Sequence, residues 1–371
     1  MRGQTRRSFQ SFEGKGEVIE VTVRPVPLSI LDQSEELLQS GFWGHFKQEF
    51  GWQAHPFEAT VNGARFNILV LSRRVLRLFS IAYVPFGPAF DPSAQSQPLD
   101  RGEFLARLAA ALRAHLPRLT VFLRFDLPWE KTGDAPEWRA GGSRILKARY
   151  DMQPPSTVMV DISFSEERIL AGMKPKTRYN IKLAAKKGVG VREAGNQDFD
   201  AWYALYQETG RRDRIAIHSQ NYYRGLLRGA FSYAGDKPSV KLLLARYGDV
   251  LLAGNIVLFW KRMAVYLTGA SSGEMRDLMP TYALQWEAIR LAKKAGCAQY
   301  DLYGIPPKPD PAHPMYGLYQ FKTGFSDKLI ERWGSWDSPN SSILYFLYRA
   351  AEGARMILHR GVRKRLRIRS R

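Results

Sequence analysis

The 371-residue sequence contains one cysteine, Cys297, and only six histidines. A single cysteine cannot form a disulfide within the chain, which is typical of proteins from reducing compartments. The histidines are scattered without paired spacing, so the sequence carries no zinc signature. We therefore expect no metal ion and no redox cofactor.

Long apolar runs are also missing. The most apolar windows, residues 68–71 and 251–260, are too short or too interrupted to cross a bilayer. The basic start of the chain continues into Ser, Gln, Glu and Gly rather than into an apolar stretch, so it predicts no targeting segment. These features predict a cytoplasmic protein without an integral membrane anchor.

Acidic residues are scarce relative to basic ones. The chain has 35 Asp and Glu against 55 Lys and Arg, a formal net charge of +20. Residues 341–371 alone hold nine basic residues and one acid, Glu352. Such a balance favours polyanionic partners, either nucleic acid or an anionic membrane surface at the inner face of the membrane. The alternative for the basic tail is a segment that only keeps the protein soluble.

Length and hydrophobic pattern indicate an α/β protein of two domains. At 371 residues and 45% hydrophobic composition, the chain is long enough for two cores. The order of elements resembles acetyltransferase-like (GNAT) domains, and residues 128–143 are predicted to form a long loop that faces substrate. Apolar periodicity predicts strands at 17–23, 64–72, 75–82, 120–126, 156–163, 189–193, 239–247, 251–260 and 262–269, and helices at 31–46, 102–116, 199–209, 222–231 and 282–295.

One lysine near the end of the sequence is enclosed by aromatic residues. A short strand ending in Asp301 runs into a Gly/Pro turn, and Lys322 follows between Tyr319, Phe321 and Phe325. A lysine in apolar surroundings acts strongly on developing negative charge, such as the oxyanion of a tetrahedral intermediate. The alternative is a surface lysine on an edge strand beside core aromatics.

Basic residues also recur at helical spacing in the middle of the chain. Pro175 either kinks a helix or opens a new one. Arg178, Lys182 and Lys186 then lie four residues apart and share one face. Such a stripe either follows a phosphate backbone or is simply a solvated face. Residues 185–190 have the glycine spacing of a CoA pyrophosphate turn, but they follow a helix and precede a strand, the reverse order, which disfavours acyl-CoA.

These segments together resemble the FemABX family, peptidyltransferases that add amino acids to peptidoglycan precursors from aminoacyl-tRNA. The resemblance runs in the family's order from about residue 35 to 337, and no single motif carries it. The matching segments are residues 42–47, 176–189, 266–272, 280–289 and 300–336.

The resemblance implies an α/β (α+β) fold of two GNAT-like domains with mixed, largely antiparallel sheets. We expect residues 1–16 to be a flexible basic N-terminus. Residues 17–163 together with 334–371 would form the first domain, completed by the basic C-terminal helix, and residues 164–333 the second. The long coiled-coil arm of some family members has no counterpart in this sequence, which resembles the compact type.

The resemblance also implies roles for single residues. Lys322 matches the catalytic lysine that stabilises the oxyanion, and the backbone carbonyl of Phe321 is expected to orient the attacking amine. Lys47 matches a lysine that contacts the precursor's phosphates. Tyr266 and Tyr222 match tyrosines of the same cleft.

The chain departs from the family pattern at His218, where an arginine would precede Tyr222 by four residues. A neutral histidine binds a pyrophosphate less well than a bidentate arginine does. Arg214, one turn upstream, is a candidate to compensate. The sequence shows no clear general base, and Asp126 is a candidate for that role.

We therefore predict an aminoacyltransferase that moves an amino acid from aminoacyl-tRNA to the side-chain amine of a peptidoglycan precursor. Arg178, Lys182 and Lys186 are candidate tRNA contacts. The acceptor is either the UDP-linked or the lipid-linked precursor, and the basic tail is a candidate for peripheral contact with an anionic membrane. The alternatives are an acyl-CoA or other acyl N-transferase, and a non-catalytic protein that binds RNA or a membrane surface.

Overall fold

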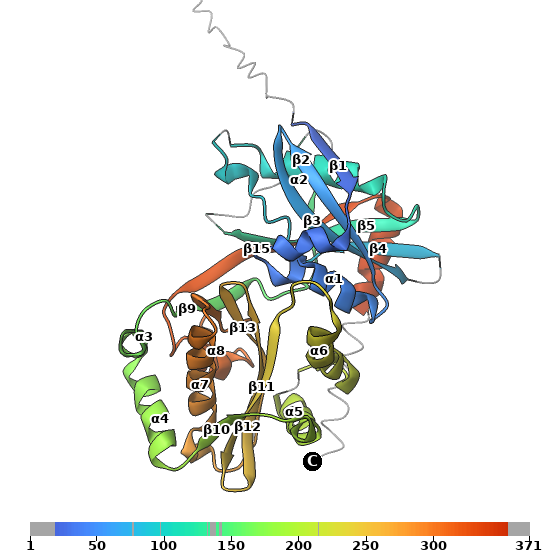
Figure 1. Cartoon of the computed structure of the whole chain (residues 1–371). Coiled ribbons are helices and arrows are strands. Elements are labelled where there is room, and N and C mark those ends of the chain that lie inside the picture. The colour runs from blue at the N-terminus through green and yellow to red at the C-terminus, as the bar shows by residue number, and fades with distance from the viewer. Residues whose placement is uncertain are drawn as a thin grey trace, which may run out of the picture.

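The computed structural model describes residues 19–354, apart from 76–77, 97, 132, 134–138, 141–142 and 214. Figure 1 shows two lobes, one above the other. The upper lobe contains the beginning of the described chain and also its end. The lower lobe contains most of the second half of the sequence.

The first lobe is built on a largely antiparallel sheet. Its main strands are β1 (Val21–Pro25), β2 (Gln53–Val61), β3 (Ala64–Val75), β4 (Phe79–Val84), β5 (Thr120–Glu130) and β15 (Leu329–Pro339). Only β4 and β5 among these neighbours run parallel, and the chain between them forms η3 (Pro92–Ala94) and α2 (Arg101–Arg113). Phe104, Leu105, Leu108 and Leu112 of α2 are fully buried against this sheet.

The second lobe has a sheet covered by helices on both faces (Figure 1). Its strands are β9 (Ser156–Asp161), β10 (Gly190–Glu193), β11 (Ser239–Tyr247), β12 (Val250–Trp260), β13 (Met263–Ser271) and β14 (Gln299–Asp301). One face packs on α3 (Glu166–Gly172), α4 (Pro175–Lys186), α7 (Pro280–Lys294) and α8 (Tyr316–Lys322). The other packs on α5 (Phe199–Asp213), α6 (Gln220–Ser232) and, from the first lobe, α1 (Gly41–Gln48). Short helical turns η4 (Asn196–Asp198) and η5 (Arg276–Leu278) precede α5 and α7.

Strand β15 joins the two lobes. Residues 329–331 pair with β9 and residues 332–339 pair with β5, so one sheet continues through both lobes. Its strand order is β1-β2-β3-β4-β5-β15-β9-β14-β13-β12-β11-β10, with β8 (Leu146–Lys147) paired beside β15. Val158 and Val160 of β9 lie in the core of the second lobe with Tyr300. We therefore propose a domain boundary near residue 155 rather than at residue 163.

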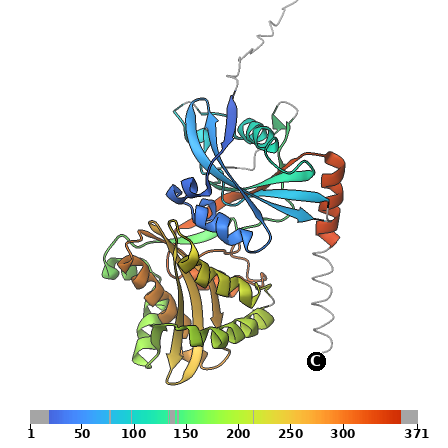
Figure 2. The same cartoon turned by 45° about the vertical axis from the view of Figure 1, so that its right-hand side comes forward.

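The end of the described chain returns to the first lobe. Residues 342–354 form a helix, which Figure 2 shows against that lobe. The rings of Tyr345 and Tyr348 contact Phe122 of β5, with centroids 5.5 and 4.8 Å away. The Tyr345 hydroxyl also donates a 2.7 Å hydrogen bond to Asp337 Oδ2. The arginine-rich residues 355–371 and the predicted flexible residues 1–16 lie outside the described part of the chain.

Several predicted elements differ from the structure. The helix expected over residues 31–46 is instead η1 (Leu28–Gln33), η2 (Leu37–Gln39) and α1. Ser34 and Ser40 separate these pieces because serine hydroxyls bond nearby backbone groups and compete with helical bonds. Strand β2, which contains Pro56, was not predicted. The expected loop at 128–143 begins later, since β5 runs to Glu130, and includes β6 (Arg139–Ala140) and β7 (Ser143–Arg144).

The helices of the second lobe agree better with the sequence. Pro175 opens α4 at its first position, where a missing N–H costs nothing. Ser165 caps α3, as its hydroxyl accepts a bond from the Arg168 N–H. Between residues 164 and 333, of which only residue 214 is not described, the longest helices have 15 residues. This part of the chain therefore contains no long coiled-coil arm.

Candidate active site

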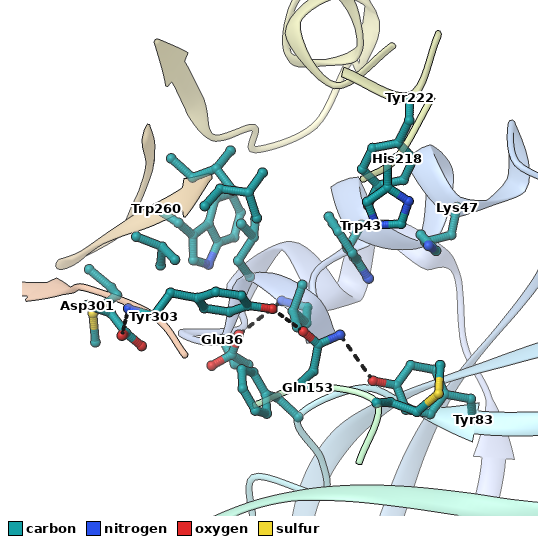
Figure 3. A pocket seen from close by; sticks show the side chains of 18 of the residues that line it. Glu36, Trp43, Lys47, Tyr83, Gln153, His218, Tyr222, Trp260, Asp301 and Tyr303 are labelled. Carbon is teal, nitrogen blue, oxygen red and sulfur yellow. Dashed lines mark hydrogen bonds between the residues drawn. The ribbon is translucent and has the colours of Figure 1, made fainter. Parts of the chain in front are cut away.

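A cavity of about 370 Å³ is lined by residues of both lobes. Figure 3 shows it from close by, with Lys47 on one side and Asp301 on the other. Its walls come from η2, α1, α6, β12, β13 and the turn after β14. They are largely aromatic, with Trp43, Trp52, Tyr222 and Trp260 among them. A concave, mostly apolar site with few charged groups is typical of ligand binding.

Lys47 supplies positive charge at one end of the cavity. Its Nζ lies 5.4, 5.8 and 5.5 Å from the ring centroids of Trp43, Trp52 and Tyr222. Burial, together with the charge of Arg73, lowers the pKa of Lys47 to about 8. The three rings stabilise the ammonium through cation–π contacts and keep it partly dry. An anionic ligand at this end would therefore meet a strong and fixed charge.

His218 and Tyr222 continue the same wall. Their rings stack with centroids 4.1 Å apart and planes 18° from parallel. Burial, with a smaller contribution from the Lys47 charge, lowers the pKa of His218, so its imidazole is neutral near pH 7. Burial also raises the pKa of the Tyr222 hydroxyl, which stays a neutral donor. Arg214, the candidate for compensating the missing arginine, lies outside the described residues.

The opposite end of the cavity is acidic. Glu36, Asp301 and Arg332 line it. Asp301 Oδ1 accepts a 2.7 Å bond from the Tyr303 N–H and a second bond from the Thr157 hydroxyl. Arg332 Nη2 lies 3.8 Å from Asp301 Oδ2. The cavity is therefore bipolar, with Lys47 at one end and two carboxylates, opposed by one guanidinium, at the other.

A chain of hydrogen bonds links the acidic end to a buried carboxyl group. The Tyr303 hydroxyl donates to Gln153 Oε1, Gln153 Nε2 to Tyr83 Oη, and Tyr83 Oη to Asp126 Oδ2 at 2.9 Å. Burial raises the pKa of Asp126 to about 7. Asp126 is 1% exposed and does not line the cavity. As a candidate base it would act only through Tyr83, and this role stays a prediction.

Lys322 lies where two strands of the second lobe diverge. β13 and β14 pair in parallel over only three residues, up to Val265 and Asp301. Lys322 Nζ donates to the carbonyl oxygens of Tyr303 at 3.1 Å and Gly304 at 2.9 Å. Its side chain ends helix α8 and is 4% exposed, so the alternative of a surface lysine on an edge strand is wrong. Burial lowers the pKa of Lys322 to about 7, although Asp301 opposes the shift.

Tyr266 and Phe321 lie on the Lys322 side of the sheet. The ring of Tyr266 is 5.3 Å from Lys322 Nζ. Because strand residues alternate in direction, Val265 and Leu267 line the cavity whereas Tyr266 packs on the opposite core. The expectation that Tyr266 shares a cleft with Lys47 is corrected accordingly.

The backbone of Phe321 already has local partners. Its carbonyl accepts a 3.1 Å bond from the Gly324 N–H. Its ring packs edge-on against Tyr282 and Phe325, with centroids 5.0 and 5.2 Å away. The structure thus shows Phe321 fixing the end of α8. Its role in orienting the amine stays a prediction.

Helix α4 begins beside the residues that follow Lys322. The Lys174 N–H donates to Gly324 O at 2.9 Å, and Lys174 Nζ donates to Thr323 Oγ1 at 3.4 Å. Of the three predicted basic residues, Lys182 and Lys186 are exposed. Arg178 instead bonds the carbonyl oxygens of Ala171 and Met173 and so caps α3.

Sequence reasoning missed several residues of the cavity. Glu36, Tyr83, Gln153, Tyr303 and Arg332 come from segments far apart in the chain, and Tyr303 and Gln153 are 150 residues apart. For Tyr303 the sequence offered a signal in the Tyr-Asp-Leu-Tyr-Gly run, which places this residue directly before a glycine in the predicted turn. None of the cavity residues comes from the predicted substrate loop at 128–143, as far as that loop is described.

The described residues contain neither a cluster of metal ligands nor a membrane-spanning helix. Within them, no group of three or more His, Cys, Asp or Glu side chains is arranged to hold a metal ion. Over the same residues, every helix is too short or too polar to cross a bilayer.

The fold of this chain is similar to that of solved structures. The crystal structure of FemX matches with a TM-score of 0.73 and 19% identity, covering 88% of this chain and 99% of FemX. A tandem GNAT protein from the clavulanic acid biosynthesis pathway matches at a TM-score of 0.46 and 12% identity. The predicted α/β fold with mixed, largely antiparallel sheets is confirmed.

The FemAB family model matches residues 145–246 and 236–353. This chain belongs to the FemAB family. Similar proteins include the lipid II:glycine glycyltransferase of Staphylococcus haemolyticus, 22% identical, and that of Staphylococcus aureus strain USA300, 21% identical. Each comparison covers 84% of this chain and 90% of the relative.

Proposed function

We propose that this protein is an aminoacyltransferase that moves an amino acid from aminoacyl-tRNA to the side-chain amine of a peptidoglycan precursor. The observation that carries the proposal is the buried ammonium of Lys322, held where β13 and β14 diverge, between the bipolar cavity and helix α4. The names of the staphylococcal relatives favour the lipid-linked form of the acceptor. Peripheral contact of residues 355–371 with an anionic membrane is part of the same proposal.

The cavity would hold the acceptor by its two ends. Phosphate groups would bind Lys47, whose charge is fixed by three aromatic rings, beside the Tyr222 hydroxyl. His218 would add a neutral hydrogen bond rather than the paired charge of an arginine. The stem peptide would then extend toward Tyr303, with its amine at the acidic end.

The chemical step is acyl transfer from an ester to an amine. The amine nitrogen attacks the ester carbonyl, the new C–N bond forms, and the C–O bond to the ribose breaks with its electron pair leaving on oxygen. The proton that the nitrogen loses ends on this ribose oxygen, which leaves as a hydroxyl group. An ammonium has three N–H donors. Lys322 uses two of them on Tyr303 and Gly304, which leaves the third for the oxyanion. One such donor contributes about 3 kcal/mol of transition-state stabilisation.

The donor would approach along helix α4. Lys182 and Lys186 are exposed on this helix, and Tyr179 beside them is 63% exposed. Lysines neutralise phosphates, and an exposed aromatic ring offers a surface on which an unpaired base stacks. Since Lys174, the N-cap of α4, lies next to Thr323, RNA bound here would lead its acceptor end to Lys322.

The experiment is a transfer assay with purified protein and tRNA charged with a labelled amino-acid pool. UDP-linked and lipid-linked precursors are supplied in separate reactions. We expect label in the lipid-linked precursor and loss of transfer after ribonuclease treatment. Transfer to neither precursor by correctly folded protein would contradict the proposal.

The acyl-CoA alternative finds little support in the geometry. Gly188, the centre of the CoA-like spacing, has φ of 83° and ends α4, where its N–H bonds Ala185 O. It follows the C-cap residue Lys187 in the left-handed position that commonly ends a helix, because glycine adopts this conformation without steric cost. Acetyl-CoA added in place of charged tRNA is the matched negative control in the same assay.

A further inference from the structure

Glu36 is a cavity residue whose chemistry the proposed reaction does not yet use. It lies between η1 and η2. The indole N–H of Trp260 holds this segment by donating a 2.9 Å hydrogen bond to Ser34 O. Figure 3 shows the Glu36 carboxylate beside Tyr303 and Gln153. Its position is therefore set by contacts from both lobes.

A structural role accounts for only one of the two oxygen atoms of this carboxylate. Oε1 accepts a 3.1 Å bond from the Leu38 N–H and so caps η2. Among the described residues, Oε2 has no hydrogen-bond partner. A neutral glutamine would provide the same cap, so capping does not require the charge. Exposing a second, unpaired carboxylate oxygen to a largely aromatic cavity is costly unless a cation binds there.

The charges around Glu36 favour a cationic ligand. Burial raises the pKa of Glu36 to about 7, Asp301 and Asp126 add to the rise, and Arg332 opposes it. Arg332 also lies 3.8 Å from Asp301, and its guanidinium stacks on Phe86 with 5.1 Å to the ring centroid. Glu36 and Asp301 thus share one guanidinium. A single ammonium group would balance the remaining negative charge.

The position also suits the proposed reaction. Asp301 directly precedes the turn whose Tyr303 and Gly304 carbonyls accept bonds from Lys322. A ligand cation between Glu36 and Tyr303 would therefore sit on the cavity side of the turn, with Lys322 on its other side. The amine that attacks the ester has to reach this point.

We propose that Glu36 is a positioning residue that binds the primary ammonium of the acceptor side chain. This inference rests on the proposed function. Glu36 Oε2 forms a charge-assisted hydrogen bond with this ammonium, while Lys47 holds the phosphate end. The subsite selects acceptors that carry a free, unacylated primary amine. Glu36 recognises the amine before the chemical step.

The test compares binding of two forms of the precursor that supports transfer, one with a free side-chain amine and one with this amine acetylated. Titration calorimetry is done with wild type, Glu36→Gln and Glu20→Gln. Glutamine at residue 36 keeps the cap on Leu38 and removes the charge. Glu20 is an exposed residue of the first lobe that does not line the cavity, so its variant controls for the loss of one acidic charge.

We expect wild type and Glu20→Gln to bind the free-amine form about tenfold more tightly than the acetylated form, the range of a charge-assisted hydrogen bond. Glu36→Gln should lose this preference and bind the acetylated form as wild type does. In the transfer assay it should raise KM more than it lowers kcat.

Three results would overturn the inference without touching the proposed function. Equal binding of both forms by wild type would show that no subsite recognises the amine, even if transfer itself succeeds. If Glu36→Gln still bound the free-amine form more tightly than the acetylated form, another residue would have to bind the amine. Equal weakening of both forms in Glu36→Gln would show a structural role only. Failure of wild type to transfer to or bind any precursor would remove the proposed function and this inference with it.

Discussion

The ammonium of Lys322 donates a 3.1 Å hydrogen bond to the backbone carbonyl of Tyr303. Tyr303 has φ of 59°, a left-handed conformation that is uncommon for a tyrosine. Its hydroxyl reaches into the cavity and bonds Gln153. Lys322, the proposed catalytic residue, thus bonds the backbone of Tyr303 on the side that faces away from the cavity. The two faces of the second-lobe sheet are linked at this point, where β13 and β14 diverge.

The burial of Lys322 predicts a pH-dependent stability. Its pKa is about 7 in the folded protein and near 10.5 when unfolded. Between these values the unfolded chain binds a proton that the folded chain does not, so the free energy of unfolding rises with pH from this group. We expect wild type to gain stability relative to Lys322→Met between pH 7 and 9. Urea unfolding at both pH values checks this, and a constant difference would contradict the depressed pKa.

Lys47 should control acceptor binding rather than the chemical step. Lys47→Met keeps the contacts with Trp43, Trp52 and Tyr222 but removes the charge. We expect KM for the precursor to rise about tenfold or more, the range of a hydrogen bond to a charged group, with kcat little changed. Arg73→Met, which removes a charge near Trp52, should give a smaller rise. Unchanged KM in Lys47→Met would place the phosphates elsewhere.

His218 offers a substitution that should improve binding. An arginine at residue 218 would bring a second charge beside Lys47 and could stack on Tyr222 as the imidazole does. We expect His218→Arg to lower KM for the precursor several-fold and to increase its salt dependence. Initial rates at two ionic strengths measure both effects. Weaker binding by this variant, with normal thermal stability, would mean that the wall is matched to a neutral group.

The exposed lysines of α4 should matter for the donor alone. Lys182→Glu combined with Lys186→Glu reverses two charges beside Tyr179. We expect a higher KM for aminoacyl-tRNA, a smaller dependence of binding on salt, and unchanged binding of the precursor. The matched control is Arg65→Glu with Arg118→Glu, two exposed residues of the first lobe. Equal losses in both double variants would indicate non-specific attraction.

The sequence predicted the pattern of the fold well where apolar periodicity was strong. Strands β11, β12 and β13 agree closely with the expected ranges, because each is a long apolar run ended by polar turn residues. Strand β2 was not predicted because Pro56 and partly exposed residues weaken its alternation of apolar and polar residues. Lys322 was expected in an apolar setting and is buried, at the end of helix α8, which the sequence pattern did not predict.

The site could be predicted only in part. Lys47, His218 and Tyr222 were grouped through the family resemblance, and they line one cavity. Tyr266 was grouped with them but faces the opposite core, since a one-residue difference along a strand reverses the direction of a side chain. Glu36 could not have been found from sequence. Its surroundings form only when η2 packs against residues far along the chain, such as Tyr303 and Arg332.

The most direct test of the account is transfer by Lys322→Met in a single-turnover reaction with charged tRNA and lipid-linked precursor. Binding of each substrate and thermal stability are measured on the same preparation. We expect both substrates to bind with nearly normal affinity while the transfer rate falls by about a hundredfold or more, the loss of one oxyanion donor. Transfer at close to the wild-type rate would contradict the account, because the chemistry would then not depend on the buried ammonium between the cavity and α4.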